Sequence, residues 1–262
     1  CQNCLKSMLL LIERESLSMS NPFENTEGIA KRTMVLFFVV DTSGSMAGKK
    51  IGAVNDAIFN VLPEIRKISE DNADAEIKIA AITFSNGAKW LYDEPKPADE
   101  FSWPYVNADG MTDLGEAYRM LNEKLSRNAF MNDVEGSYAP AIFLMTDGEP
   151  TDDYKKELDR LNQNKWFRVA IKVAVAIGEK DDVNDEVLTE FTGTPEAVLR
   201  AHTPEALAKM IRLVSVTASK IGSQSSTVGQ ESRQKTFTEE LNKQQQEWQP
   251  VNSADDEDEE WN

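Results

Sequence analysis

Cysteine and histidine are almost absent from this chain. Its 262 residues include two cysteines, Cys1 and Cys4, and one histidine, His202. Two cysteines at one end of the sequence cannot form a disulfide framework, and no second pair completes a zinc site. His202 has no catalytic partner at a suitable spacing, so it offers no general base. We interpret the cysteines as incidental and His202 as structural.

Basic charge and long hydrophobic runs are also scarce. The chain has 28 Lys and Arg against 45 Asp and Glu, a formal net charge of −17. A surface of this sign repels phosphate backbones and anionic lipid headgroups. The longest apolar run, residues 34–40, is far shorter than the roughly 20 residues of a membrane-spanning helix. We therefore expect neither nucleic acid nor a membrane as a partner.

The two ends of the sequence differ from its middle. Residues 1–31 lack a clear apolar period and form an N-terminal extension. Residues 13–16 can be encoded by a purine-rich, ribosome-binding-like stretch just before Met19. From this we predict that translation starts at Met19 and that residues 1–18 are an untranslated artefact.

Residues 220–262 are rich in Ser, Gln, Lys and Glu and end in an acidic run, a composition that predicts a disordered tail. Two other interpretations remain open. Phe237, Trp248 and Trp261 are large side chains that a grooved partner could bind. Alternatively, the acidic run Asp255 to Glu260 occupies a binding site of the protein itself until a partner displaces it.

Residues 32–219 alternate between short apolar runs and helical periodicity, which is typical of βαβ units around a parallel sheet. After the first run, apolar residues from Ile51 to Ile68 recur at steps of three and four, as on one face of a helix. The pattern predicts an α/β domain with a doubly wound, mainly parallel, six-stranded sheet flanked by helices, in a Rossmann-like arrangement. The expected strands are Met34–Val40, Ile77–Phe84, Lys89–Tyr92, Ala141–Met145, Val169–Ile177 and Ala197–Arg200.

Oxygen-bearing side chains follow the ends of these predicted strands. The first strand leads into Asp41, Ser43 and Ser45, and a later one into Asp147. Thr112 precedes a helical stripe that starts at the same edge, and ligands of such sheets bind beyond the carboxyl ends of the strands. Hydroxyl and carboxylate oxygens without thiolate or imidazole suit Mg²⁺ or Mn²⁺. We expect one divalent cation at this edge.

The joint pattern D-x-S-x-S, a distant Thr and a distant Asp resembles the von Willebrand factor type A domain with its metal-ion-dependent adhesion site. All five positions are filled, by Asp41, Ser43, Ser45, Thr112 and Asp147. The resemblance covers roughly residues 32–219. It implies that the three hydroxyls bind the metal directly, that the two carboxylates bind largely through water, and that one vertex is left for a partner's Glu or Asp.

Within this family, segments such as FSNGAKWL and FLMTDGEPTDDYKK look most like bacterial, cytoplasmic, tellurium-resistance TerY-like members. That resemblance implies a cytoplasmic location and a role in stress response or phosphorylation-linked signalling, with kinase or phosphatase components as partners.

Two functions of different classes follow. The favoured one is a non-enzymatic module that binds an acidic residue of a partner protein through the metal. The alternative is a Mg²⁺-dependent phosphoryl-transfer or hydrolytic enzyme that uses Asp41 and Asp147. The sequence has neither a phosphate-binding glycine loop nor a G-x-S-x-G turn to support the alternative.

Overall fold

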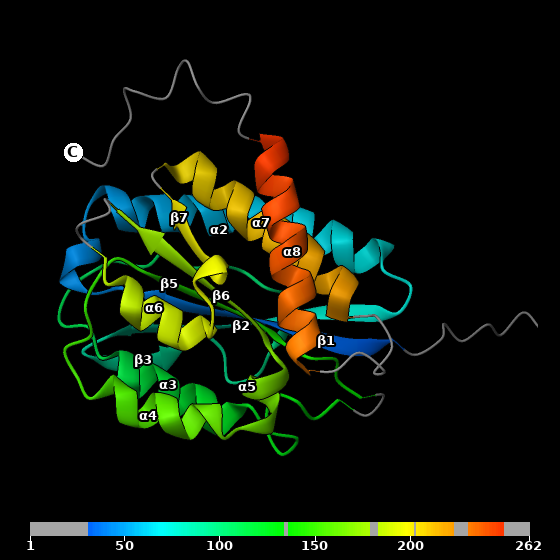
Figure 1. Cartoon of the computed structure of the whole chain (residues 1–262), viewed down its shortest axis with the longest axis horizontal. Helices are drawn as coiled ribbons and strands as arrows, with labels where there is room; N and C mark the ends of the chain where they lie inside the picture. Colours follow the sequence, from blue (N-terminus) through cyan, green and yellow to red (C-terminus); the bar gives the residue numbers. More distant parts are fainter. Residues whose placement is uncertain (1–30, 134–135, 179–182, 202, 223–229, 249–262) are drawn as a thin grey trace, which may run out of the picture. The chain divides into compact units, whose positions relative to one another are not determined.

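A computed structural model describes residues 31–133, 136–178, 183–201, 203–222 and 230–248 (Figure 1). The predicted start at Met19, the side chain of Trp248, Trp261 and the acidic run 255–260 lie outside the described residues.

A seven-stranded sheet forms the centre of the fold, in the order β3-β2-β1-β5-β6-β7, with β4 paired to β2. The pairs among β1, β2, β5, β6 and β7 are parallel, whereas β3 and β4 run antiparallel to β2. The doubly wound, mainly parallel α/β fold predicted from the sequence is therefore confirmed. The strands are β1 (Arg32–Asp41), β2 (Ala75–Ser85), β3 (Gly87–Trp90), β4 (Lys96–Pro97), β5 (Ala141–Thr146), β6 (Ile171–Ile177) and β7 (Val198–Ala201).

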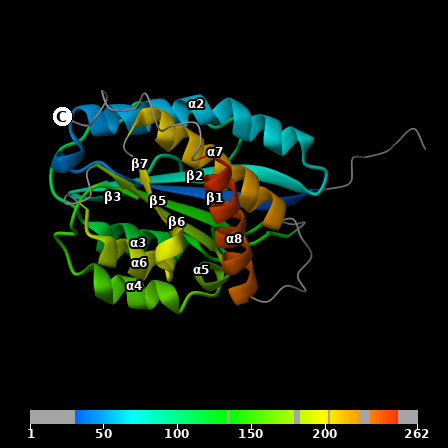
Figure 2. The same ribbon diagram turned by 45° about the horizontal axis from the view of Figure 1, so that its top comes forward.

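Helices cover both faces of the sheet (Figures 1 and 2). On one face, even-numbered β1 residues such as Phe38 pack with α2 and α7. On the other, odd-numbered residues such as Phe37 pack with α3, α4, α5 and α6. The helices are α2 (Lys49–Asp71), α3 (Leu114–Lys124), α4 (Tyr154–Asn162), α5 (Lys165–Val169), α6 (Asp185–Thr192), α7 (Pro204–Gly222) and α8 (Gln230–Trp248), with short 3₁₀ turns η1 (Gly44–Met46) and η3 (Pro195–Ala197).

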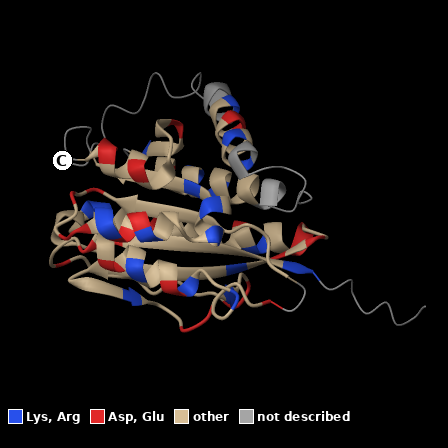
Figure 3. Ribbon diagram, turned by 60° about the horizontal axis from the view of Figure 1, so that its bottom comes forward, with Lys and Arg blue, Asp and Glu red and all other residues tan. Residues whose placement is uncertain are grey.

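Charged residues are few on the strands and more frequent on the helices and loops (Figure 3). Eight β1 residues, Met34 to Asp41, are fully buried. This burial on both faces explains why β1 has a continuous apolar run rather than an alternating pattern.

Three expectations about the strands and helices need correction. The sheet has seven strands rather than the expected six. The additional strand, β4, has only two residues, one of them a proline, so it has no recognisable strand pattern in the sequence. The strand expected from Val169 begins at Ile171, because Asn164 accepts hydrogen bonds from the backbone N–H groups of Trp166 and Phe167 and caps the short helix α5. The segment Thr151-Asp152-Asp153 predicts a helix that starts at Thr151. Helix α4 instead begins at Tyr154, because the Asp152 carboxylate accepts from the backbone N–H groups of Gly115 and Glu116.

The expected disordered tail is wrong for residues 230–248, which form α8. Phe237 and Leu241 are fully buried in the core that α2 and α7 share. The side-chain amide of Gln234 accepts from the backbone N–H of Lys172 at 3.0 Å and donates to its carbonyl at 2.9 Å. Lys172 lies in the part of β6 that precedes the residues paired with β7, since that pairing begins at Ala174. The helix thus pairs backbone groups that β7 does not reach.

Candidate functional site

Two neighbouring parallel strands bring the first acidic residues together. Asp41 is the last residue of β1, and Thr146, the last residue of β5, precedes Asp147. The register pairs Val40 with Met145, so Asp41 and Thr146 come next on adjacent strands. Thr146 Oγ1 donates to Asp41 Oδ2 at 2.6 Å. The strand ends therefore meet at the edge where ligands of such sheets bind.

The turn after β1 directs its hydroxyls toward Asp147. The backbone N–H of Ser43 donates to Asp41 Oδ1 at 2.8 Å. The hydroxyls of Ser43 and Ser45 lie 3.0 Å apart, and Ser45 Oγ donates to Asp147 Oδ1 at 2.7 Å. Four of the five predicted ligands thus belong to one connected network of hydrogen bonds.

Thr112 enters the site from a third loop, which the loop after β5 holds in place. The backbone N–H of Thr112 donates to Thr151 Oγ1 at 3.0 Å, and the backbone N–H of Thr151 donates to the Thr112 carbonyl at 2.9 Å. A Cβ on Gly148 would lie 3.3 Å from Ser45 Oγ and 3.8 Å from Thr112 Oγ1. The two hydroxyls therefore flank the space that a glycine at position 148 leaves open.

A lysine already supplies a positive charge here. Lys50, in the first turn of α2, places its Nζ 2.7 Å from Asp147 Oδ2. The side chain of Asp147 is 0% exposed and that of Lys50 18%. The ammonium therefore compensates a buried carboxylate in this structure.

Asp41 is also fully buried, with 0% exposure. Burial raises the pKa of its carboxyl, while hydrogen bonds from Thr146 and Ser43 act in the opposite direction and the nearby charge of Asp147 adds to the rise. Both carboxylate oxygens already accept hydrogen bonds. The group is held in a fixed orientation below the two serines.

The donor set fits a hard divalent cation. A cavity of about 490 Å³ opens above it, bordered by Ser45, Thr112, Asp147 and Gly148. The described part of the chain contains no group of three or more His, Cys, Asp or Glu side chains that could hold a metal ion. Any metal bound here would need the serine and threonine hydroxyls as ligands together with the two carboxylates. Oxygen-only donors of this kind are typical of Mg²⁺ and Mn²⁺ sites.

The structure brings all five predicted residues to one place, but the sequence did not reveal several residues that position them. Lys50 could have been found in the first turn of the helix after the D-x-S-x-S turn, and Thr146 directly before Asp147. Asp152 gave no such signal. Its carboxylate accepts from the backbone N–H groups of Gly115 and Glu116, at the start of a helix 37 positions earlier in the chain.

Comparison with known proteins defines the family. The model of the von Willebrand factor type A domain matches residues 36–213. This chain therefore belongs to that family, whose members typically act as protein-interaction or adhesion modules. Among curated proteins, inter alpha-trypsin inhibitor heavy chain 4 from Mus musculus is 28% identical over 132 residues, which are 48% of this chain and 13% of the mouse protein. The chain spans only a small part of that relative.

Solved structures show the same fold at low identity. The pilus adhesin SpaC from Lactobacillus rhamnosus GG, in its open conformation, superposes with a TM-score of 0.57 at 16% identity, covering 74% of this chain and 31% of that one. Proximal thread matrix protein 1 from the mussel byssus, with zinc in its adhesion-site motif, gives a TM-score of 0.52 at 15% identity, covering 72% of this chain and 48% of that one.

Proposed function

We propose that this protein is a non-enzymatic interaction module that binds an acidic side chain of a partner protein through a divalent cation. The proposed ligands are Asp41, Ser43, Ser45, Thr112 and Asp147. The observation that carries the proposal is the convergence of three loops on one oxygen-only cluster beneath an open cavity. A cation held largely by neutral hydroxyls stays electrophilic and can accept a further carboxylate.

Mg²⁺ and Mn²⁺ are the proposed cations because all the donors are hard oxygens. The zinc in the mussel protein's motif makes Zn²⁺ a third ion to test. Among the described residues, Lys50 is the cation that now contacts Asp147. The Asp147 carboxylate therefore interacts with positive charge.

The geometry gives the enzymatic alternative little support. A general base must come within hydrogen-bond reach of a proton of the substrate. Asp41 is fully buried, and the side chain of Asp147 is 0% exposed and forms an ion pair with Lys50. Release of p-nitrophenol from p-nitrophenyl phosphate in Mg²⁺, lost in Asp41→Asn, would instead favour the enzyme.

The proposed setting is a bacterial, cytoplasmic stress response of the tellurium-resistance type or a phosphorylation-linked signalling system. It rests on the resemblance of segments such as FSNGAKWL to TerY-like proteins. Kinase or phosphatase components are the expected partners.

The test combines metal binding with partner capture. Titration calorimetry with Mg²⁺ and Mn²⁺ should show one site that Asp41→Asn weakens at least tenfold, while the matched control Asp99→Asn, an exposed turn residue, has no effect. Pull-down in Mg²⁺ and in EDTA should retain a partner only with metal and intact Asp41. A partner that still binds in EDTA and to Asp41→Asn would refute the metal-dependent mechanism.

A further inference from the structure

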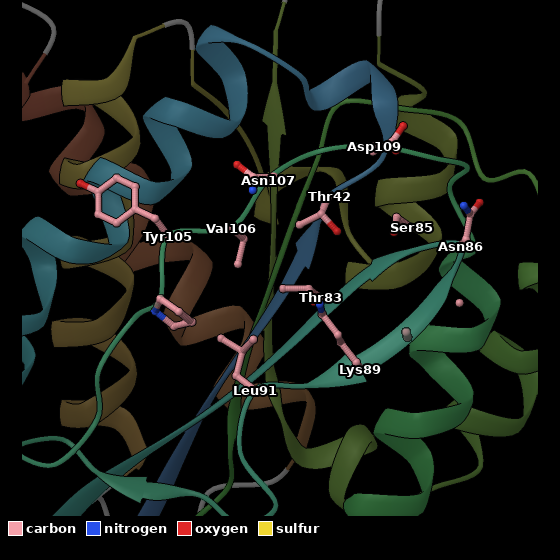
Figure 4. A pocket seen from close by; sticks show the side chains of 13 residues that line it. Thr42, Thr83, Ser85, Asn86, Lys89, Leu91, Tyr105, Val106, Asn107 and Asp109 are labelled. Carbon is pink, nitrogen blue, oxygen red and sulfur yellow. The ribbon is translucent and has the colours of Figure 1, made fainter.

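A second pocket lies beside the metal site, on the face of the sheet that carries α2. It has a volume of about 510 Å³, within the usual range for ligand-binding pockets, and lies between β2, β3 and the loop 104–109 (Figure 4). Thr42, between Asp41 and Ser43 in the chain, is part of its wall. This pocket, called here the β2–β3 pocket, therefore begins one residue away from two proposed metal ligands.

The pocket contains a buried hydroxyl without a partner. Ile77, Ile79 and Ala81 of β2 belong to the core on this face, but the next residue on it is Thr83. Thr83 is 2% exposed, and its Oγ1 has no hydrogen-bond partner among the described residues. A buried donor left unpaired in this way is unfavourable, so a ligand that accepts its hydrogen bond gains from it.

A lysine stands directly opposite this hydroxyl. β2 and β3 are antiparallel, and their register pairs Thr83 with Lys89. Side chains paired in this way share one face of the sheet, with Cβ atoms about 4.5–5.5 Å apart. Figure 4 shows both side chains in the pocket wall.

The rest of the wall suits an acidic side chain. Asn86 Oδ1 accepts from the backbone N–H of Met111, which leaves its Nδ2 as a donor. Leu91 and Val106 offer apolar contacts for methylene groups. The one carboxylate of the lining, Asp109, accepts from the N–H of its neighbour Gly110. The wall of the β2–β3 pocket thus contains three hydrogen-bond donors, from Lys89, Thr83 and Asn86.

We propose that the β2–β3 pocket binds a second acidic side chain of the partner, next to the acid that docks on the metal. Lys89 and Thr83 bind its carboxylate, and Leu91 and Val106 contact its methylenes. This inference rests on the proposed function, because it places both acids on one partner. Binding within the pocket itself needs no metal.

The pocket and the metal site share their dividing wall. The backbone N–H of Asp109 donates to the carbonyl of Thr42 at 2.9 Å, and that of Gly44 donates to the carbonyl of Gly110 at 3.0 Å. Two acidic residues close together in a partner's sequence would reach the metal site and the β2–β3 pocket at the same time. Two linked contacts raise the effective concentration of the second and select for a doubly acidic segment.

The pocket can be tested separately from the metal site by working in EDTA. The probes are N-acetyl-glutamate N-methylamide and its glutamine counterpart, which has the same shape without the charge. Methyl NMR of the full chain should show saturable shifts at Leu91, Val106 and Thr83 with the glutamate probe, and binding at least fivefold weaker with the glutamine probe. Lys89→Met should weaken glutamate binding at least fivefold, whereas Lys67→Met, an exposed lysine of α2, should leave it unchanged.

Thr83→Val gives an independent check that keeps the shape of the pocket. It should weaken the glutamate probe about threefold or more without lowering the free energy of unfolding, because the hydroxyl that it removes has no partner. Equal binding of both probes, full binding to Lys89→Met, or no shifts at the pocket would overturn the proposal. None of these outcomes would affect metal binding by Asp41 and Asp147, so the two proposals can fail separately.

Discussion

At the residue scale, the contact between Lys50 and Asp147 bears on the proposed metal site. Lys50 Nζ is 2.7 Å from Asp147 Oδ2, and the side chain of Asp147 is fully buried. A divalent cation near Asp147 would meet this charge at close range. Repulsion between like charges in a partly buried site is worth kilocalories per mole, so Lys50 would lower the affinity of the proposed site for a metal ion unless the lysine moved away.

Replacing Lys50 by methionine should therefore tighten metal binding. Removing the competing charge while keeping the length of the side chain should lower the Kd for Mg²⁺ about tenfold, equivalent to roughly 1.4 kcal/mol. Titration calorimetry checks this, with Lys67→Met as the charge-matched control. An unchanged Kd in Lys50→Met would mean that the lysine leaves Asp147 without cost when metal binds.

At the scale of single elements, loops from different parts of the chain hold the start of α3. The backbone N–H groups of Gly115 and Glu116 donate to Asp152, which belongs to the loop before α4. Capping side chains normally come from the residue before the helix, here Asp113, but Asp113 accepts from the N–H of Gly87 instead. Position 115 has no room for a side chain, because a Cβ there would lie 2.8 Å from Asp152 Oδ2 and 3.0 Å from Tyr154 Cα.

Asp152→Ala should destabilise the protein by about 1–3 kcal/mol, because two helix N–H groups lose their acceptor. Urea denaturation measures the change. Asp159→Ala, an exposed acid of α4, should change stability by less than about 0.5 kcal/mol. A loss no larger than that of the control would show that water replaces the Asp152 carboxylate without cost.

Helix α8 shows where sequence composition alone misleads. Its residues are mostly Gln, Lys and Glu, a composition typical of disorder. Only the spacing of Gln234, Phe237 and Leu241, at three and four positions, gives a hint of one buried stripe. The stripe is too narrow to stabilise an isolated helix, so its packing against the domain must supply the stability.

Phe237→Ala should cost about 3–5 kcal/mol, as other truncations of fully buried aromatic residues do. Thermal or urea unfolding of the full chain tests this, with Lys243→Ala, an exposed residue of α8, as the control. Equal stability of the two variants would mean that α8 does not pack on the domain in solution.

At the scale of the whole molecule, the proposed metal binding would be linked to stability. A ligand that binds only the folded state stabilises it by about 2.7 kcal/mol at 100 times its Kd. Mg²⁺ at that concentration should therefore raise the Tm, EDTA should reverse the rise, and Asp147→Asn should abolish it. Asp99→Asn should keep the full rise. A metal-induced rise that persists in Asp147→Asn would place the cation elsewhere.

The net charge of −17 also acts at this scale. It opposes association with other acidic surfaces unless a local cation compensates. The proposed metal and Lys89 would supply such cations side by side. Both lie at the carboxyl edge of the sheet, where the parallel strands of this fold place their binding loops. Among the described residues, no helix is both long and apolar enough to cross a membrane.

The α/β class, the main strands and the five candidate ligands could be predicted from residue patterns alone. Apolar runs, helical periodicity and the D-x-S-x-S turn are local patterns. Thr112 and Asp147 are distant from that turn, but each adjoins a predicted helix or strand that ends at the same edge of the sheet. The folded structure was needed to show the contact of Lys50, the capping of α3 by Asp152, the packing of α8 and the pairing of Thr83 with Lys89. Most of these contacts join segments that are distant in the sequence. Strand order and packing bring such segments together, and no local pattern predicts them.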